Sequence, residues 1–129
     1  MDVNIGDIVL SDAALAHLPH LKQCPMLIIT KPDSYGNLLG LSLNAHEPGS
    51  NSPWKICISA KEAGIPSNAS ISVSYPHIIH KTSCRAIYGT VKKEFLDYVL
   101  RLFVKFSASV YFEASSPRDS FAVPASGKV

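Results

Sequence analysis

The spacing of apolar residues along the chain changes at Gly89-Thr90. This change restricts the possible folds more than any other feature of the sequence. Before that point, apolar residues alternate with polar ones, as in 39–43, and this period of two is typical of strands with one buried face. After it, apolar residues recur every three or four positions over 91–106, which predicts an amphipathic helix. The sequence therefore predicts a mainly β fold: a small, strongly curved sheet or barrel of five or six strands, capped by a C-terminal helix.

The strands expected before the helix are short and bounded by turn residues. They are expected at 8–10, 26–30, 39–43, 54–59, 69–75 and 84–88. A loop over 45–53 and a short turn at Ala60–Gly64 separate them, and Thr90 is a candidate N-cap for the helix. Within 69–75 the alternation predicts an outer face of Ser70, Ser72 and Ser74, and a core face that includes Tyr75.

The length of 129 residues favours a single domain, and a hydrophobic fraction of 47% is enough for a core without disulfides or structural metals. We expect residues 1–107 to form this domain. Residues 108–129 form an Ala/Ser/Pro-rich tail that is either loosely held or adds one edge strand at Val110-Tyr111-Phe112. The N-terminus has no secretory pattern and no apolar run is long enough to span a bilayer, which predicts a cytoplasmic protein without membrane contact.

The cysteines and histidines carry no metal-binding pattern. Cys24, Cys57 and Cys84 are far apart without a Cys-x-x-Cys pair, so buried, reduced thiols are expected. The pair His17 and His20 and the pair His77 and His80 each have a spacing that one helical turn could bring together. Pro19 opposes a regular helix at the first pair and no third ligand is evident, so we expect surface imidazoles and no metal or other cofactor.

Four short motifs in this order resemble the MazF/PemK family of toxin–antitoxin toxins, over about residues 5–106. The segment Gly6-Asp7-Ile8-Val9-Leu10 is similar to the family's opening strand, and 22–29 (KQCPMLII) is similar to its Lys-x-Arg-Pro-x-Leu-Val-Ile motif. The segment 62–66 (EAGIP) with Ser70 resembles an Ala-Gly-Leu-Pro…Ser stretch, and 87–91 (IYGTV) resembles the closing segment. The resemblance implies an SH3-like barrel and a homodimer. It also implies metal-independent cleavage of single-stranded RNA and inhibition by an antitoxin.

At three places the chain departs from the residues that the family uses for cleavage. Cys24 stands where the family has a cationic Arg, Asn44 where it has a Thr or Ser, and Ser72 and Ser74 where some members have an Arg-x-Asp pair. Cleavage needs a base, a cation and an acid, and the loss of one preorganised donor can cost roughly 100- to 1000-fold. A rescued catalytic set would consist of Lys22, Asn44 and His46, and further groove residues are expected at His17, His20, Cys24, Ser72, Ser74 and His77.

Three functions remain open from the sequence. The first is an active endoribonuclease toxin with unusual residues, and the second is a catalytically silent relative that binds RNA or an antitoxin-like peptide in the same groove. The third is a CcdB-like inhibitor of a protein target, which the Ala/Ser/Pro tail disfavours. Trp54, Tyr35 and Tyr75 are candidates for stacking on RNA bases beside the basic residues Lys31, Lys55 and Lys81, although alternation places Trp54 and Tyr75 in the core.

Overall fold

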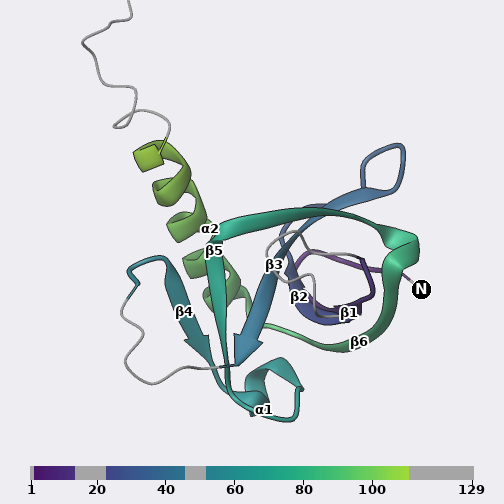
Figure 1. Cartoon of the computed structure of the whole chain (residues 1–129), viewed down its shortest axis with the longest axis horizontal. Helices are drawn as coiled ribbons and strands as arrows, with labels where there is room; N and C mark the ends of the chain where they lie inside the picture. The colour runs from purple at the N-terminus through teal and green to yellow at the C-terminus, as the bar shows by residue number, and fades with distance from the viewer. Residues whose placement is uncertain (1, 14–22, 46–51, 111–129) are drawn as a thin grey trace, which may run out of the picture.

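One antiparallel sheet contains all the strands of the described part of the chain, and a long helix packs against it (Figure 1). The computed structural model describes residues 2–13, 23–45 and 52–110. The strand order across the sheet is β4-β5-β3-β2-β1-β6. The elements are β1 (Asp7–Ser11), β2 (Cys24–Ile28), β3 (Asn37–Ala45), β4 (Lys55–Ile58), α1 (Ala60–Ala63), β5 (Ala69–His80), the 3-10 turn η1 (Lys81–Ser83), β6 (Cys84–Thr90) and α2 (Lys93–Ala108). The prediction of a mainly β fold with a C-terminal helix is confirmed.

Strand β5 bends sharply halfway along its length, as Figure 1 shows. It pairs with β3 on both sides of the bend, at Leu43↔Ile71 and at Leu41↔Pro76. Between these pairs, residues 72–75 of β5 lie opposite the single residue Ser42 of β3. Extra residues on one strand of a pair bend that strand and increase its twist. The sheet therefore curls, and β5 extends to His80, beyond the predicted end at residue 75.

Both faces of the curled sheet are buried. Leu27, Leu41 and Ile71 lie in the core cluster beneath α2, whereas Met26 and Ile28 lie in a second cluster on the opposite face. Successive residues of β2 therefore enter different cores, as its unbroken apolar run predicts. The strand begins at Cys24, earlier than expected, and proline is tolerated close to a strand's first residue, where Pro25 lies.

The faces of β5 differ from the sequence prediction. Ser70 and Ser72 are 7% and 3% exposed and Ser74 is half-buried, so the predicted outer face is wrong. The curl encloses this face with the second core cluster, and small side chains there retain little contact with solvent. Tyr75 is 52% exposed, so its predicted core position is also wrong, because it lies where the extra residues of β5 interrupt the alternation.

Helix α2 covers the first face with an apolar stripe that includes the buried Val99 and the half-buried Phe95 and Phe106. The ring of Trp54 packs edge-on against Phe106 with a centroid distance of 5.2 Å, which confirms the predicted core position of Trp54. None of the helices in the described ranges has the length and hydropathy needed to cross a bilayer.

The ends of α2 correct two expectations. The helix is capped at Lys92 without a side-chain hydrogen bond, and Thr90 instead donates to Asp7 at 2.7 Å. The N-cap prediction for Thr90 is therefore wrong, because β6 keeps the chain extended through that residue. Beyond α2 the chain remains helical through Val110, so this residue does not begin an edge strand, while Tyr111 and Phe112 lie outside the described residues.

The predicted turn at Ala60–Gly64 is a short helix, α1. The Ser59 hydroxyl accepts from the Glu62 backbone N–H at 3.2 Å and donates to the Glu62 carboxylate at 3.2 Å. Ser59 is therefore the N-cap of α1, and this Ser-x-x-Glu pattern, readable in the sequence, is typical of helix starts. Gly64 ends the helix in the left-handed region with φ 71°.

We expect Gly64→Ala to destabilise the protein by about 2–4 kcal/mol, measured by urea denaturation. A Cβ at Gly64 would lie 2.4 Å from the carbonyl oxygen of Tyr88, and the positive φ adds strain. Gly89→Ala is the matched control, since its Cβ would lie 3.4 Å from the nearest atom without a positive φ, and we expect a change within about 1 kcal/mol. Equal losses of stability in the two variants would contradict the conclusion that the contact between α1 and β6 excludes a side chain at position 64.

Candidate functional site

Small polar and sulfur-containing side chains form a row across the sheet. Ser11 of β1 pairs with Cys84 of β6 and with Cys24 of β2. On the other side of the sheet, Asn44 of β3 pairs with Ser70 of β5, and Ser70 pairs with Cys57 of β4. Directly paired residues in an antiparallel sheet point to the same face. We call the set of Cys84, Ser11, Cys24, Asn44, Ser70 and Cys57 the cross-strand row.

The two halves of the cross-strand row meet between β2 and β3. The register Met26↔Ser42, continued by two residues on each strand, places Cys24 opposite Asn44. The Cys24 Sγ donates to the Leu43 carbonyl at 3.8 Å, in agreement with this register. Every strand of the described sheet thus contributes one residue to the row, on the face opposite α2.

The structure brings together three of the residues singled out from the sequence. Cys24 and Asn44 are members of the row, and Ser72 lies beside it on β5, paired with Lys55 of β4. Ser74 follows on the same strand within the register shift. His77 lies beyond the bend of β5, opposite Gly40 of β3, so it is separated from Asn44 by four positions along the sheet. The other candidates, Lys22, His46, His17 and His20, lie outside the described residues.

Cys24 is a neutral, buried thiol. It is 1% exposed, and its Sγ donates to the carbonyl oxygens of Pro25, at 3.3 Å, and Leu43. Burial raises the pKa of the Cys24 thiol, and the hydrogen bond to Leu43 opposes this effect more weakly. The thiol therefore neither carries the positive charge of a guanidinium nor ionises readily to a nucleophile.

Lys55 and Ser42 extend the polar face around the row. Lys55 and Cys57 are exposed on β4, while the alternating Ile56 and Ile58 are buried on the α2 side, so the prediction that Cys57 is buried is wrong. The sequence analysis considered Lys55 only as a basic residue beside aromatic residues. Its alternation with Ile56 already indicated that it lies on the face opposite the apolar core under α2. Ser42 is fully buried next to Met26, and its hydroxyl has no hydrogen-bond partner among the described residues. Ser70 belongs to the Ala-Gly-Leu-Pro…Ser resemblance and to the alternating serines of 69–75, whereas no motif in the sequence indicates Ser42.

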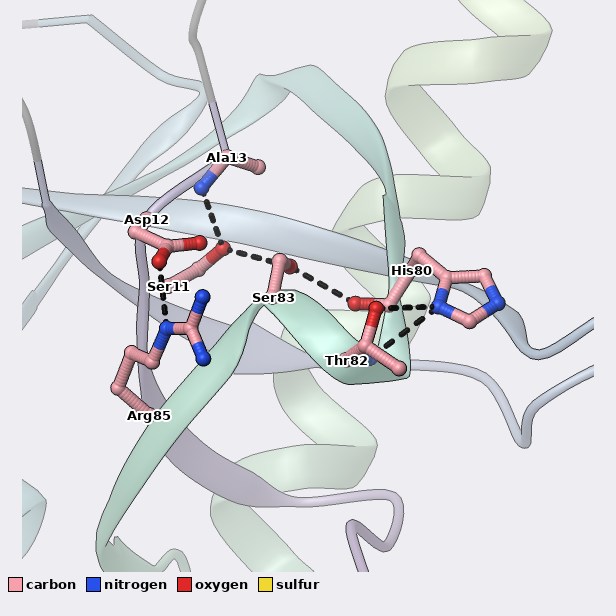
Figure 2. A network of polar contacts seen from close by, with 7 residues as sticks. All are labelled: Ser11, Asp12, Ala13, His80, Thr82, Ser83 and Arg85. Atoms are coloured by element: carbon pink, nitrogen blue, oxygen red, sulfur yellow. Dashed lines mark hydrogen bonds and ion pairs between the residues drawn. The ribbon is translucent and has the colours of Figure 1, made fainter.

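A polar network holds the β1–β6 end of the row, and Figure 2 shows its members. The Ser11 hydroxyl accepts from the Ala13 N–H at 3.1 Å and lies 3.1 Å from the Ser83 hydroxyl. The Ser83 hydroxyl in turn donates to the His80 carbonyl at 2.7 Å. Arg85 forms an ion pair with Asp12 across the same strands, and both side chains are partly exposed, so this pair contributes at most about 1 kcal/mol.

His80 has a structural role in this network. Its Nε2 lies 2.7 Å from the Tyr35 carbonyl, which can only accept, so Nε2 carries the proton. Its Nδ1 accepts from the Thr82 backbone N–H at 3.2 Å and lies 2.8 Å from the Thr82 hydroxyl (Figure 2). His80 thus joins η1 to the β2–β3 turn. Within the described ranges, no group of three or more His, Cys, Asp or Glu side chains is placed to hold a metal ion.

The molecule also has an open pocket of about 720 Å³ beside η1. The described residues that line it are Asp2, Val3, Asn4, Pro32, Lys81, Thr82 and Cys84. It therefore meets the cross-strand row only at Cys84, among the described residues, and is remote from Asn44 and Ser70.

Comparison with known proteins identifies the fold but not a family. No family model matches the chain, and no curated protein matches it. Among solved structures, a mycobacterial endoribonuclease in complex with its cognate antitoxin aligns with a TM-score of 0.60 at 10% identity, covering 78% of this chain and 89% of that one. A second mycobacterial endoribonuclease aligns with a TM-score of 0.61 at 11% identity, covering 81% and 90%. The chain therefore shares its fold with these endoribonucleases.

We expect an alkylating reagent at pH 8 to label Cys57 at least about tenfold faster than Cys24 in the folded protein, measured by mass spectrometry of peptides. Burial raises the pKa of the Cys24 thiol and shields it from the reagent, whereas Cys57 is exposed. Labelling of Cys24 therefore increases only at higher pH. In denaturant the two thiols should react alike, and faster labelling of Cys24 in the folded protein would identify it as a reactive nucleophile.

Proposed function

We propose that this protein is a member of the MazF/PemK type of toxins and that it binds single-stranded RNA at the solvent-reachable part of the cross-strand row, at Asn44 and Cys57. One observation carries the proposal: Cys24, Asn44 and Ser72, from three different strands, lie on one face of the sheet. These are positions where the sequence resemblance locates the chemistry of the family. The fold shared with two endoribonucleases supports the same assignment.

The chemistry of the row favours binding over rapid cleavage. The amide group of the half-buried Asn44 both donates and accepts hydrogen bonds, which suits base edges and the ribose 2′-hydroxyl. Cleavage also requires groups that move protons and a cation that stabilises the charged transition state. The six side chains of the row are thiols, hydroxyls and one amide, and none of them is an ammonium, guanidinium, imidazole or carboxylate group. We therefore propose that cleavage, where it occurs, is slow.

Residues next to the row in the sequence provide the means for cleavage. Lys22 precedes Cys24 by two positions, and His46 follows Asn44 by two. In this second candidate function, Lys22 supplies the cation, Asn44 a hydrogen bond to the reacting phosphate or ribose, and His46 the proton transfer. No metal ion or other cofactor takes part in this proposal.

The protein partners are part of the proposal. One structural neighbour is an endoribonuclease in complex with its cognate antitoxin, and we propose an antitoxin-like partner for this chain too. In the silent alternative, the protein binds RNA or such an antitoxin-like peptide at the same site without cleaving RNA. A CcdB-like action on a protein target is the weaker alternative. We propose a cytoplasmic location, in keeping with RNA as the target.

The test is incubation of the purified protein with a long, labelled single-stranded RNA in the presence of a chelator. If the protein is catalytic, it should cleave the RNA at few sites. The rate of cleavage should then fall at least roughly 100-fold in Lys22→Ala and in Asn44→Ala. The silent alternative predicts RNA binding without fragments, measured by gel shift in the same samples. A protein that neither binds nor cleaves RNA would refute the proposed function, and the search would turn to a protein target.

We also propose a homodimer formed through the C-terminal end of α2. The apolar stripe continues to Val110, which is exposed, and Figure 1 shows this end of the helix extending past β4. Light scattering at high protein concentration should give twice the monomer mass. Val110→Asp should shift the equilibrium towards monomer by at least about tenfold in the dissociation constant, since it buries a charge. A monomer at all concentrations would contradict the dimer.

A further inference from the structure

The second half of β5 has an open edge. The segment of β4 bonds to β5 only as far as Trp54, whose carbonyl accepts from the Val73 N–H at 3.0 Å. From residue 76 to residue 80, β5 pairs with β3 on one side, and no strand pairs with its other side within the described ranges. Figure 1 shows this half of β5 running away from α2 towards η1. The edge therefore presents a line of backbone groups with which another strand can pair.

The register with β3 fixes which backbone groups of β5 point outward. The Lys81 N–H donates to the Gly36 carbonyl at 2.8 Å. Hydrogen-bonded pairs alternate along an antiparallel ladder, so every second residue before Lys81 also directs its backbone groups towards β3. The residues between them direct their backbone groups away from β3. These outward residues are Pro76, Ile78 and His80.

An apolar residue occupies the centre of this edge. The Ile78 side chain is 76% exposed, and Pro76 and His80 on either side of it are also exposed. Open edges are commonly protected by charged side chains, by proline or by a bulge. Pro76 and the extra residues 72–75 protect the first part of this edge, whereas Ile78 leaves its centre open to a second strand.

The hydrogen-bonding groups of the edge are complementary to those of a second copy. When two such edges pair antiparallel about a twofold axis at Ile78, each Ile78 N–H donates to the Ile78 carbonyl of the other copy. Each His80 N–H then donates to the Pro76 carbonyl of the other copy. Pro76 has no N–H to donate to the opposite His80 carbonyl, but that carbonyl already accepts from the Ser83 hydroxyl at 2.7 Å. Every outward backbone group of the edge thus has a partner.

We infer that two copies of this chain pair through residues 76–80 of β5, antiparallel about a twofold axis at Ile78. An unrelated strand paired in the same way would direct a carbonyl at Pro76 without receiving a hydrogen bond, and an unmade bond of this kind is costly. The contact lies apart from the C-terminal end of α2 and does not depend on RNA binding (Figure 1). It is smaller than the roughly 20–30 residues a side of a standard interface, so it joins dimers only at higher protein concentrations.

The test uses Val110→Asp, which disfavours the α2 contact, and measures mass by sedimentation equilibrium over a range of protein concentrations. We expect this variant to form dimers at the highest concentrations. Adding Ile78→Lys should raise the dissociation constant at least about fivefold, because the two like charges would lie directly opposite each other. Adding Val104→Lys is the matched control, since Val104 is an aliphatic residue on α2 that is 65% exposed, and the dissociation constant should not change. Circular dichroism checks that each variant is folded.

Hydrogen exchange at single backbone amides provides a second measurement. Protection of the Ile78 and His80 amides should increase with protein concentration, whereas the Ile79 amide, which points towards β3, should exchange at a constant rate. The inference is overturned if Val110→Asp is a monomer at every concentration, if its dimer persists in Ile78→Lys, or if exchange at Ile78 is independent of concentration. In each of these cases the RNA-binding proposal stands, because RNA binding is measured separately.

Discussion

The mismatch between β3 and β5, where residues 72–75 lie opposite Ser42, determines the curl of the sheet and therefore which side chains are buried. Extra residues on one strand bend it, and the sheet then curls around its second face. Both faces become buried, which explains how Leu27 and Met26, neighbours in β2, enter different cores. Without this bend the polar residues of β5 would face solvent, as simple alternation predicts.

The cross-strand row follows from the same geometry. Each strand contributes one polar or sulfur-containing side chain at the same level of the sheet. Burial then decides the chemistry of the row, because desolvation raises the pKa of the Cys24 thiol and favours its neutral form. The result is a face that forms hydrogen bonds with little charge, bordered by Lys55 on β4. Among the six members of the row, Asn44 is half-buried and Cys57 is exposed, whereas the other four are buried.

Two different interactions hold the ends of the curled sheet: hydrogen bonds at one end and close backbone packing at the other. At the β1–β6 end, Ser11, Ser83 and His80 form hydrogen bonds that satisfy buried or half-buried polar groups. After β4, the end of α1 packs closely against β6. The Tyr88 carbonyl leaves no room for a side chain at position 64, so this position requires glycine. Both contacts join segments distant in sequence and thereby keep the row's strands in register.

The sequence by itself determined the fold class, the helix over its apolar stripe, the approximate strands and the core position of Trp54, because these depend on local periodicity. A family resemblance in the sequence also indicated Cys24, Asn44 and Ser72 as candidates for one site, and strand pairing places the three on one face of the sheet. Only the tertiary structure decided that Ser72 is buried, that Tyr75 is exposed and that Lys55 borders the row. These features depend on strand register and on the bend of β5, and pairing between residues far apart in the chain leaves no periodic trace in the sequence.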